Sequence, residues 1–341
     1  MGNKIIIMKD LHERLKEPFL SAQIDLAEWV YKQEWNNENN YFLQLGDLYY
    51  FYNPSPKVHA NVIDLFENKL RFKKKIVIAG NNRHEYNRSK KEYVIEAVEK
   101  LKNVETDYKP TIRDIEGFKF LTLPWFYDSI HKDLGIMKDY YNSLPEKYSK
   151  ESYDYIFYHL EDETINFDGE GVIDLSYINT KKRLGGHIHK KQKNYNLGMP
   201  ILSRYDEKDE PNELLMIDLH TKEETIIKVP KFIDYYEINY GKEIIEKDYE
   251  AKYMIFDITN CPDMKKTELD YIEKYKDNTH IYFRKFEVKL SDNESIDNQV
   301  FDIKNNVTIP ELMKQFFINN KTDKQVQDKI KEVKNNETKL D

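Results

Sequence analysis

The chain has 341 residues, of which 40% are hydrophobic and 33% are charged, and its formal net charge is −8. This length allows more than one domain with a sizeable core, and the negative charge argues against a protein that coats nucleic acid by charge alone. No apolar run approaches the roughly 20 residues of a membrane helix. The single cysteine excludes an internal disulfide and fits a reducing compartment. A strand pattern follows Met1 so closely that no signal peptide fits before it, so we expect a cytoplasmic protein.

The first 80 residues alternate between strand and helix patterns. Short apolar runs predict three strands, at Lys4–Met8, Tyr41–Leu45 and Lys75–Ala79. Apolar residues at helical spacing predict helices between them, over about residues 18–35 and 58–71. This alternation is typical of an α/β sheet.

Later segments predict further strands and a change of character after residue 230. The strands are expected at Phe118–Leu123, Tyr153–Phe157, Glu213–Leu219, Tyr253–Ile258 and His280–Lys289. The last two belong to a small α+β unit. A polar, linker-like stretch follows it, and two amphipathic helices with capping-box starts are predicted over the remainder.

Five short fragments carry side chains that bind divalent metals. They are Asp10-Leu11-His12, Gly46-Asp47, Gly80-Asn81-Asn82, His159 and Gly186-His187-Ile188-His189. Asp10, Asp47 and Asn81 each follow a predicted strand, and sites in open α/β sheets assemble at the carboxyl ends of strands. His187 and His189 are two residues apart on a segment predicted to be extended, so we expect them to point to the same face.

Oxygen and imidazole donors of this kind suit two divalent ions, and two ions about 3.5–4 Å apart catalyse phosphodiester hydrolysis. A carboxylate has two oxygens, so we predict that Asp47 bridges the ions. Asp10, His12 and one of the two later histidines would complete one ion. Asn81, His159 and the other histidine would complete the second. Manganese suits this ligation, although iron or zinc would fit too.

The fragments resemble the pattern of the calcineurin-like metallophosphoesterases: Asp-x-His, Gly-Asp, Gly-Asn-His, His and Gly-His-x-His. The resemblance covers about residues 1–228. More narrowly, the chain is similar to the SbcD-type nuclease subunits of the DNA double-strand-break repair complex, especially the short phage versions. This similarity rests on Gly46-Asp47-Leu48-Tyr49, Asn53-Pro54-Ser55-Pro56, Leu123-Pro124-Trp125 and Gly198-Met199-Pro200.

The resemblance implies a fold and a domain order. It implies an α/β fold, a metallophosphoesterase β-sandwich flanked by helices, over residues 1–228, and a small α+β capping domain over 229–290. A linker over 291–306 and a helical, partner-binding tail over 307–341 would follow. By the same analogy, His189 joins Asp10, His12 and Asp47 on one ion. His187 then joins Asp47, Asn81 and His159 on the other.

The resemblance also implies an activity and partners. It implies a manganese-dependent DNA exonuclease and endonuclease that acts in repair and recombination, works as a homodimer and docks an SbcC-type coiled-coil ATPase through its C-terminal helices. The tail has two open interpretations, since its helices either pack on their own domain or enter a groove of another chain. Two other functions also stay open, a general phosphoesterase acting on nucleotides or phosphoproteins and a catalytically weakened scaffold. A free-standing phosphatase needs no partner-binding helices, so the tail favours the nuclease.

One position departs from the family pattern. Asn82 stands where the family has a histidine that assists the leaving group. An amide cannot donate that proton, and a positioned general acid contributes about 10²–10⁴-fold. Either a two-residue insertion brings His84 into the catalytic position, since His84-Glu85 repeats the end of the family motif, or the protein is weakened. We expect Lys9, which precedes Asp10, to point away from the metals.

Two further patterns have a functional and a structural interpretation. The aromatic run Tyr49–Tyr52 either stacks on nucleic-acid bases or packs in the core and rim. The basic clusters Lys181-Lys182-Arg183 and Lys190-Lys191 flank the Gly-His-Ile-His fragment. They are either surface lysines and arginines or contacts for substrate phosphates.

Overall fold

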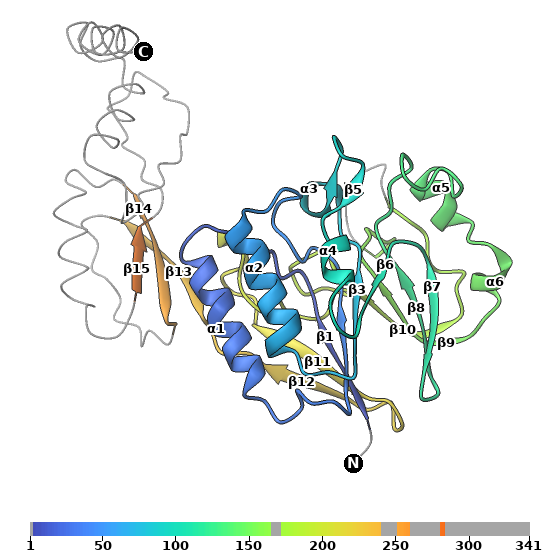
Figure 1. The fold of residues 1–341 in the computed structure, drawn as a ribbon, viewed down its shortest axis with the longest axis horizontal. Helices are drawn as coiled ribbons and strands as arrows, with labels where there is room; N and C mark the ends of the chain where they lie inside the picture. The colour runs from blue at the N-terminus through green and yellow to red at the C-terminus, as the bar shows by residue number, and fades with distance from the viewer. Residues whose placement is uncertain (1–2, 165–171, 240–250, 260–279, 284–341) are drawn as a thin grey trace, which may run out of the picture.

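The computed structural model describes residues 3–164, 172–239, 251–259 and 280–283. The predicted linker and helical tail over 291–341 lie outside these residues, as does much of the predicted capping domain. Within the described part, the chain has a mixed α/β fold, which confirms the predicted class (Figure 1). In that part, no helix combines the length and the apolar character needed to cross a membrane.

Six strands form the larger sheet, in the order β12-β11-β1-β2-β3-β6. Its parallel part consists of β1 (Lys4–Met8), β2 (Tyr41–Gln44), β3 (Lys74–Ile78) and β6 (Val104–Asp107). Two antiparallel strands complete one edge, β11 (Glu213–Asp218) and β12 (Glu224–Lys228). The three strands predicted in the first 80 residues are confirmed, with ends that differ by at most one residue.

A second sheet has four strands, in the order β10-β9-β8-β7. They are β7 (Thr111–Ile115), β8 (Phe118–Leu123), β9 (Tyr153–Tyr158) and β10 (Thr180–Gly185). The last three run parallel to one another, while β7 forms an antiparallel pair with β8. The sheet therefore contains a second set of parallel strands whose carboxyl ends lie at one edge.

The two sheets share one hydrophobic core. Successive side chains on a strand point to opposite faces, and Ile7 and Leu43 of the larger sheet lie in one buried cluster with Phe120 and Phe157 of the smaller. The alternate side chains, such as Ile6, belong to a different cluster on the outer face of the larger sheet. The four-residue apolar runs Ile5–Met8 and Ile76–Ala79 reflect this burial on both faces.

Helices cover the outer faces of both sheets (Figure 1). On the larger sheet these are α1 (Phe19–Tyr31), α2 (Pro56–Asp64) and a π-helical turn, η1 (Leu65–Lys69). On the smaller sheet they are α5 (Met137–Asn142) and α6 (Glu146–Ser149). The helix predicted over 58–71 begins two residues earlier because Pro56 occupies its first position and Ser55 accepts a capping hydrogen bond from Val58 N.

Short elements connect these layers. They are α3 (Asn82–Glu85), β4 (Tyr86–Asn87), β5 (Glu92–Tyr93), α4 (Glu96–Glu99) and the 3₁₀ turn η2 (Tyr205–Glu207). A separate parallel sheet contains β13 (Ile233–Asn239), β14 (Tyr253–Thr259) and β15 (His280–Phe283). It contacts α1 where Tyr253 donates its hydroxyl to Asp25 Oδ2 at 2.7 Å.

The shared core gives the first testable prediction. Phe157 is fully buried, and its ring stacks on Tyr155 at a centroid distance of 4.8 Å. We expect Phe157→Ala to lower the free energy of unfolding by about 3–5 kcal/mol, because it leaves a cavity between the sheets. Chemical denaturation measures this change. The control Ile226→Ala removes a half-exposed side chain from β12 and is expected to change stability by no more than about 0.5 kcal/mol.

Candidate metal centre

The side chains predicted to bind metal follow the carboxyl ends of the parallel strands in both sheets. Asp10 lies two residues beyond β1, and Asp47 and Asn81 lie three residues beyond β2 and β3. His159 directly follows β9, and His187 lies two residues beyond β10. The fold therefore brings together segments that are up to 177 residues apart in the chain.

Backbone contacts hold the two sheets together at this edge. His159 donates its Nδ1–H to Leu45 O at 2.7 Å, and Gly186 N donates to Tyr158 O at 2.8 Å. Gly80 passes so close to β2 that a Cβ atom there would lie 2.2 Å from Asp47 N. Glycine is thus required at residue 80, because any side chain there would separate the loop that carries Asn81 from the loop that carries Asp47.

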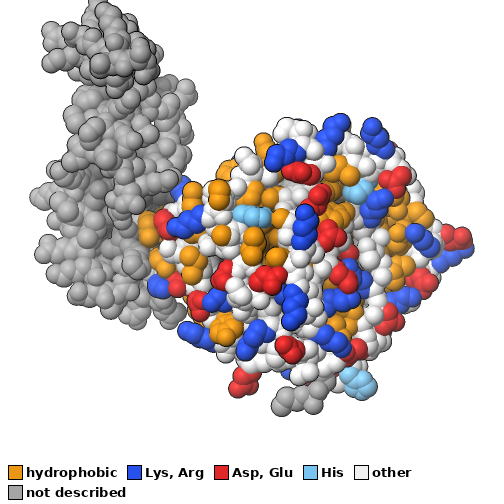
Figure 2. Space-filling model, in the orientation of Figure 1, with side chains coloured by type: hydrophobic (Ala, Val, Ile, Leu, Met, Phe, Trp, Pro, Cys, Tyr) orange, Lys and Arg blue, Asp and Glu red, His pale blue; other side chains and the backbone are white. Residues whose placement is uncertain are grey.

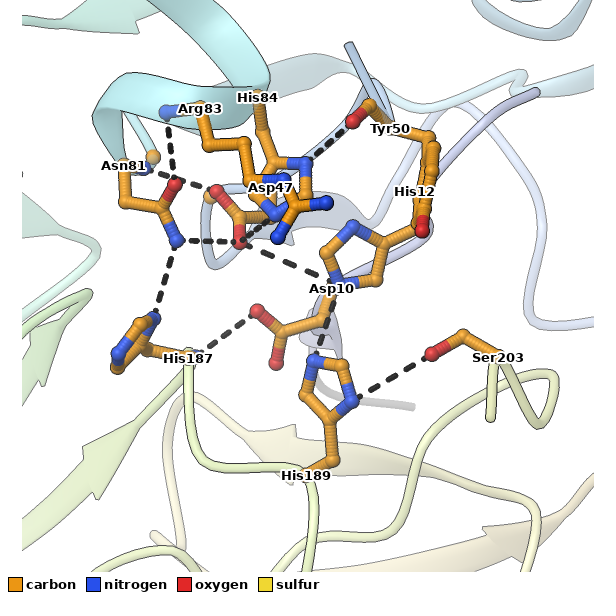
Figure 3. A network of polar contacts seen from close by, with 12 residues as sticks. Asp10, His12, Asp47, Tyr50, Asn81, Arg83, His84, His187, His189 and Ser203 are labelled. Carbon is orange, nitrogen blue, oxygen red and sulfur yellow. Dashed lines mark hydrogen bonds and ion pairs between the residues drawn. The ribbon is translucent and has the colours of Figure 1, made fainter. Parts of the chain in front are cut away.

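Three overlapping groups of side chains each place ligand atoms within 4.8 Å of one another. The groups are Asp10 with His12 and His189, His12 with Asp47 and His84, and Asp47 with His159 and His187. Figure 3 shows Asp47, His12 and His189 turned toward one another around Asp10, while the ring of His187 turns toward Asn81. Asp47 belongs to two of the groups, as does His12, so these two side chains connect the three groups.

In the first group, two imidazoles face each other. His12 Nε2 lies 2.9 Å from His189 Nε2, a contact in which two nitrogen lone pairs need a proton or a cation between them. Burial lowers the pKa of His12 well below its usual value, and the neighbouring His189 lowers it further. Asp10 accepts a hydrogen bond from His187 N at 2.8 Å through Oδ1. A cation is therefore a better partner for this group than added protons.

The third group, Asp47 with His159 and His187, centres on Asp47. His159 Nε2 lies 3.2 Å from Asp47 Oδ1, and Asn81 Nδ2 lies 3.1 Å from Asp47 Oδ2. Burial opposes the charge of Asp47, but His159 outweighs it and holds the pKa of this carboxyl below its usual value. Burial likewise opposes protonation of His159, yet Asp47 and Asp10 raise its pKa to about 9. The group has a persistent negative charge that attracts cations.

Asn81 presents its amide nitrogen to the centre. Its Nδ2 lies 3.2 Å from His187 Nδ1, while its Oδ1 accepts a hydrogen bond from Arg83 N and caps α3. To bind a metal through Oδ1, Asn81 would turn its amide by half a revolution and give up the bond to Arg83 N.

Unpaired buried atoms are what a metal would satisfy. In the described part of the chain, Asp10 Oδ2 and His12 Nδ1 are buried and have no hydrogen-bond partner, while His159 Nε2 has only its ion pair with Asp47. A buried polar atom without a partner costs about 1–3 kcal/mol. The donors are carboxylate oxygens and imidazole nitrogens, which suit manganese, iron or zinc. These buried aspartate and histidine groups therefore fit divalent metal ions.

His84 lies among these side chains, at one end of the cluster. Its Nε2 is 3.7 Å from Asp47 Oδ2, and its Nδ1 donates to Tyr50 O at 2.5 Å. The bond to a carbonyl makes Nδ1 the protonated nitrogen and leaves Nε2 facing the centre. Burial lowers the pKa of His84. The side chain of Asn82, the other residue at issue in this loop, lies outside the described part of the structure.

Two carboxylates that the sequence analysis did not identify support the ligand histidines. Glu207 accepts a hydrogen bond from His189 Nδ1, and Glu161 Oε1 lies 3.1 Å from His187 Nε2. Burial opposes the charge of Glu207, but hydrogen bonds from His189 and from the backbone of Ser203 and Arg204 lower its pKa to about 2. Such partners fix the orientation of a histidine ligand and make it more basic.

This support predicts an effect on metal affinity. We expect Glu207→Gln to weaken metal binding about 10- to 100-fold, because the amide no longer holds His189 with a negative charge. Competition with a fluorescent chelator measures the affinity. Glu223→Gln, in the exposed turn before β12, is the matched control and is expected to leave the affinity unchanged. Equal affinities for the two variants would contradict the role of Glu207.

The basic residues near the site have specific partners. Lys9 is fully buried, and its ammonium donates to Ile188 O at 2.9 Å, between the two histidines of that loop. It thus fixes the loop that carries His187 and His189. Lys181, Lys182 and Arg183 pair with Asp154, Glu224 and Glu163. They lie at the start and middle of β10, away from its ligand-bearing end, so these pairs favour the interpretation as surface lysines and arginines.

The backbone corrects one prediction about the Gly-His-Ile-His fragment. The segment was expected to be extended, but His187 has a φ of 73°, in the left-handed region. His187 therefore turns toward Asn81 and Glu161, whereas His189 turns toward His12 and Glu207. Asp10, His12 and Asp47 also have positive φ values, of 45°, 51° and 48°.

Comparisons with known proteins find no matching family model and no matching curated protein. Among solved structures, an archaeal phosphodiesterase is similar with a TM-score of 0.31 and 18% identity, over 66% of this chain and 99% of that chain. A protein of unknown function from Aquifex aeolicus has a TM-score of 0.29 and 13% identity, over 52% of this chain and 88% of that chain. At such low values, the function has to be argued from the site itself.

Proposed function

We propose that this protein is a two-metal phosphoesterase. The observation that carries the proposal is that Asp47 belongs both to the His12–Asp47–His84 group and to the Asp47–His159–His187 group, where its two oxygens could bridge two ions. The buried, unpaired Oδ2 of Asp10 and the close approach of the His12 and His189 rings support it. Two divalent ions bound there would neutralise charge on a phosphate and lower the pKa of a water molecule.

Other groups of the protein would hold the metal-binding side chains in position. The backbone amides of Asn81 and His187 orient the carboxylates of Asp47 and Asp10, at 2.8 Å in each case. Glu161 and Glu207 hold the rings of His187 and His189. His84 presents Nε2 at the rim, where a protonated imidazole can donate a proton to the leaving alkoxide.

We further propose that the substrate is DNA and that the chain is an SbcD-type nuclease subunit of the phage type. On this proposal, the two sheets correspond to the β-sandwich of the calcineurin-like metallophosphoesterases, and β13–β15 belong to the capping domain. The five ordered fragments of the sequence support this assignment. Lys/Arg and Asp/Glu side chains are interspersed over the face seen in Figure 2, which offers DNA no continuous basic surface. We therefore place DNA at the metal centre.

The partners belong to the same proposal. The chain would act as a homodimer and dock a coiled-coil ATPase of the SbcC type through residues 307–341, whose sequence predicts two amphipathic helices. A pull-down with the full chain and with a chain lacking these residues tests the docking. Capture by both chains, or by neither, would contradict it.

The activity is tested with protein stripped of metal by a chelator. We expect cleavage of linear DNA to return with manganese, together with hydrolysis of the small phosphodiester bis(4-nitrophenyl) phosphate. Hydrolysis of the small diester but not of DNA would indicate the general phosphoesterase instead. A protein that binds two metals yet cleaves neither substrate would be the scaffold.

A further inference from the structure

A cavity with a volume of about 770 Å³ opens beside the candidate metal centre. This size is within the range of small-molecule and nucleotide sites. Segments from the loop after β1, the loop after β2 and the turn η2 line it. Its lining includes Arg14, Phe19, Tyr50, Phe51 and Ser203.

The cavity adjoins the metal-binding side chains directly. Tyr50, in its wall, accepts the hydrogen bond from His84 Nδ1, and the rings of Tyr50 and His12 are 6.0 Å apart. Ser203, also in its wall, has its Oγ 3.5 Å from His189 Nδ1. A substrate whose phosphate reaches the metals therefore has its neighbouring part against this cavity.

Arg14 places a buried positive charge in the wall. Its residue is only 9% exposed, and its guanidinium carbon lies 3.3 Å from the centre of the Phe19 ring and 4.6 Å from that of Tyr50. One guanidinium nitrogen donates to Ser203 O at 2.7 Å, but Nε has no hydrogen-bond partner among the described residues. Glu207, Tyr50 and Tyr235 lie near enough to stabilise the charge of Arg14, but Nε stays without a partner in that part of the chain.

A buried guanidinium that keeps an N–H group without a partner is costly unless an acceptor completes it. The planar donors of arginine match the oxygens of a phosphate. The wall thus offers a site for a phosphate group that does not itself react.

Phe51 adds an exposed aromatic surface at the same cavity. It is 50% exposed, and its ring packs edge-on against Tyr50 at a centroid distance of 4.6 Å. An aromatic side chain held by a neighbour with one face in solvent is a stacking platform for a nucleic-acid base. A base and a phosphate together make a nucleotide, so the two features point to one ligand.

We propose that this cavity holds the nucleotide next to the scissile phosphodiester, with its phosphate on Arg14 and its base on Phe51. The inference rests on the proposed DNA substrate and adds a position and a preference. A base can stack on Phe51 only when it is unpaired, so the site selects single-stranded or frayed DNA.

The test uses the full chain with manganese and a single-stranded oligonucleotide. Its linkages are phosphorothioates, which slow hydrolysis, and it carries a 2-aminopurine base, whose fluorescence falls on stacking. We expect Phe51→Ala to weaken binding about 5- to 150-fold and to reduce the quenching. Arg14→Gln should weaken binding about 10-fold or more, while Arg14→Lys should recover part of the loss.

Tyr52→Ala is the matched control for Phe51. Tyr52 is 43% exposed in the same loop but does not line the cavity, so its variant should bind and quench as the wild type does. Melting curves identify variants of the buried Arg14 that fail to fold. Because Phe51 is exposed, Phe51→Ala is expected to fold, and its binding result tests the proposed site even if the Arg14 variants do not fold. Wild-type affinity and quenching in Phe51→Ala would overturn the cavity site while leaving the nuclease proposal intact. A wild-type protein that hydrolyses bis(4-nitrophenyl) phosphate but neither binds nor cleaves the oligonucleotide would overturn both.

Discussion

Asp47→Asn is expected to reduce phosphodiester hydrolysis by about 10³-fold or more, the largest effect of any single change. An asparagine has one oxygen instead of two and no charge, so it cannot bridge two cations. Losing one ion removes several kcal/mol of transition-state stabilisation, and about 4 kcal/mol corresponds to 10³-fold in rate. Hydrolysis of bis(4-nitrophenyl) phosphate measures the rate, and elemental analysis measures the bound metal.

The matched control is Asp133→Asn. Asp133 is exposed and pairs with Lys109 at 2.8 Å, in a loop without metal-binding side chains. We expect this variant to keep the wild-type rate and metal content. An Asp47→Asn protein that still held two metals and turned over normally would remove the basis of the proposed function.

His84→Gln is expected to lower the turnover number about 10²–10⁴-fold while leaving metal binding nearly intact. The glutamine keeps a polar group near Tyr50 O but cannot supply a proton to the leaving group. The loss should be smaller for bis(4-nitrophenyl) phosphate than for DNA, because nitrophenolate is a good leaving group that needs little protonation. Comparing the two substrates separates proton donation from a structural effect.

Asn82, in the same loop, provides a test in which activity could rise instead of fall. If the loop has lost its catalytic histidine and His84 does not replace it, Asn82→His should raise the rate of DNA cleavage. If His84 acts as the proton donor, Asn82→His should bring no gain. His220→Gln, which changes an exposed histidine in the turn after β11, is the control for both variants.

The parts of the site that could be predicted from sequence are those encoded locally. An apolar run followed by Gly-Asp or Gly-Asn specifies both a buried strand and a polar side chain at its end, so Asp47 and Asn81 could be placed at one sheet edge. Because β1, β2 and β3 are parallel, their ends meet without any further information. The same reasoning correctly located β8 and β9.

The parts that could not be predicted depend on contacts between distant segments. Glu207 is one of many acidic residues in a charged stretch, and only the fold shows that it reaches His189. Glu161 likewise has no motif around it. The turn at His187 was misjudged because alternation along a strand assumes extended backbone, and a left-handed residue breaks that rule. Lys9 would have been assigned to solvent by its charge alone, yet it is buried.

The left-handed backbone at Asp10, His12, Asp47 and His187 has an evolutionary consequence. Such conformations cost non-glycine residues about 1 kcal/mol or more each, and the orphaned polar atoms of Asp10 and His12 add to that cost. A lineage released from selection for catalysis would gain thermal robustness by exchanging these residues for glycine or apolar ones. Loss of the site is therefore energetically downhill, and on the proposed function only continued demand for hydrolysis keeps the aspartates and histidines in place.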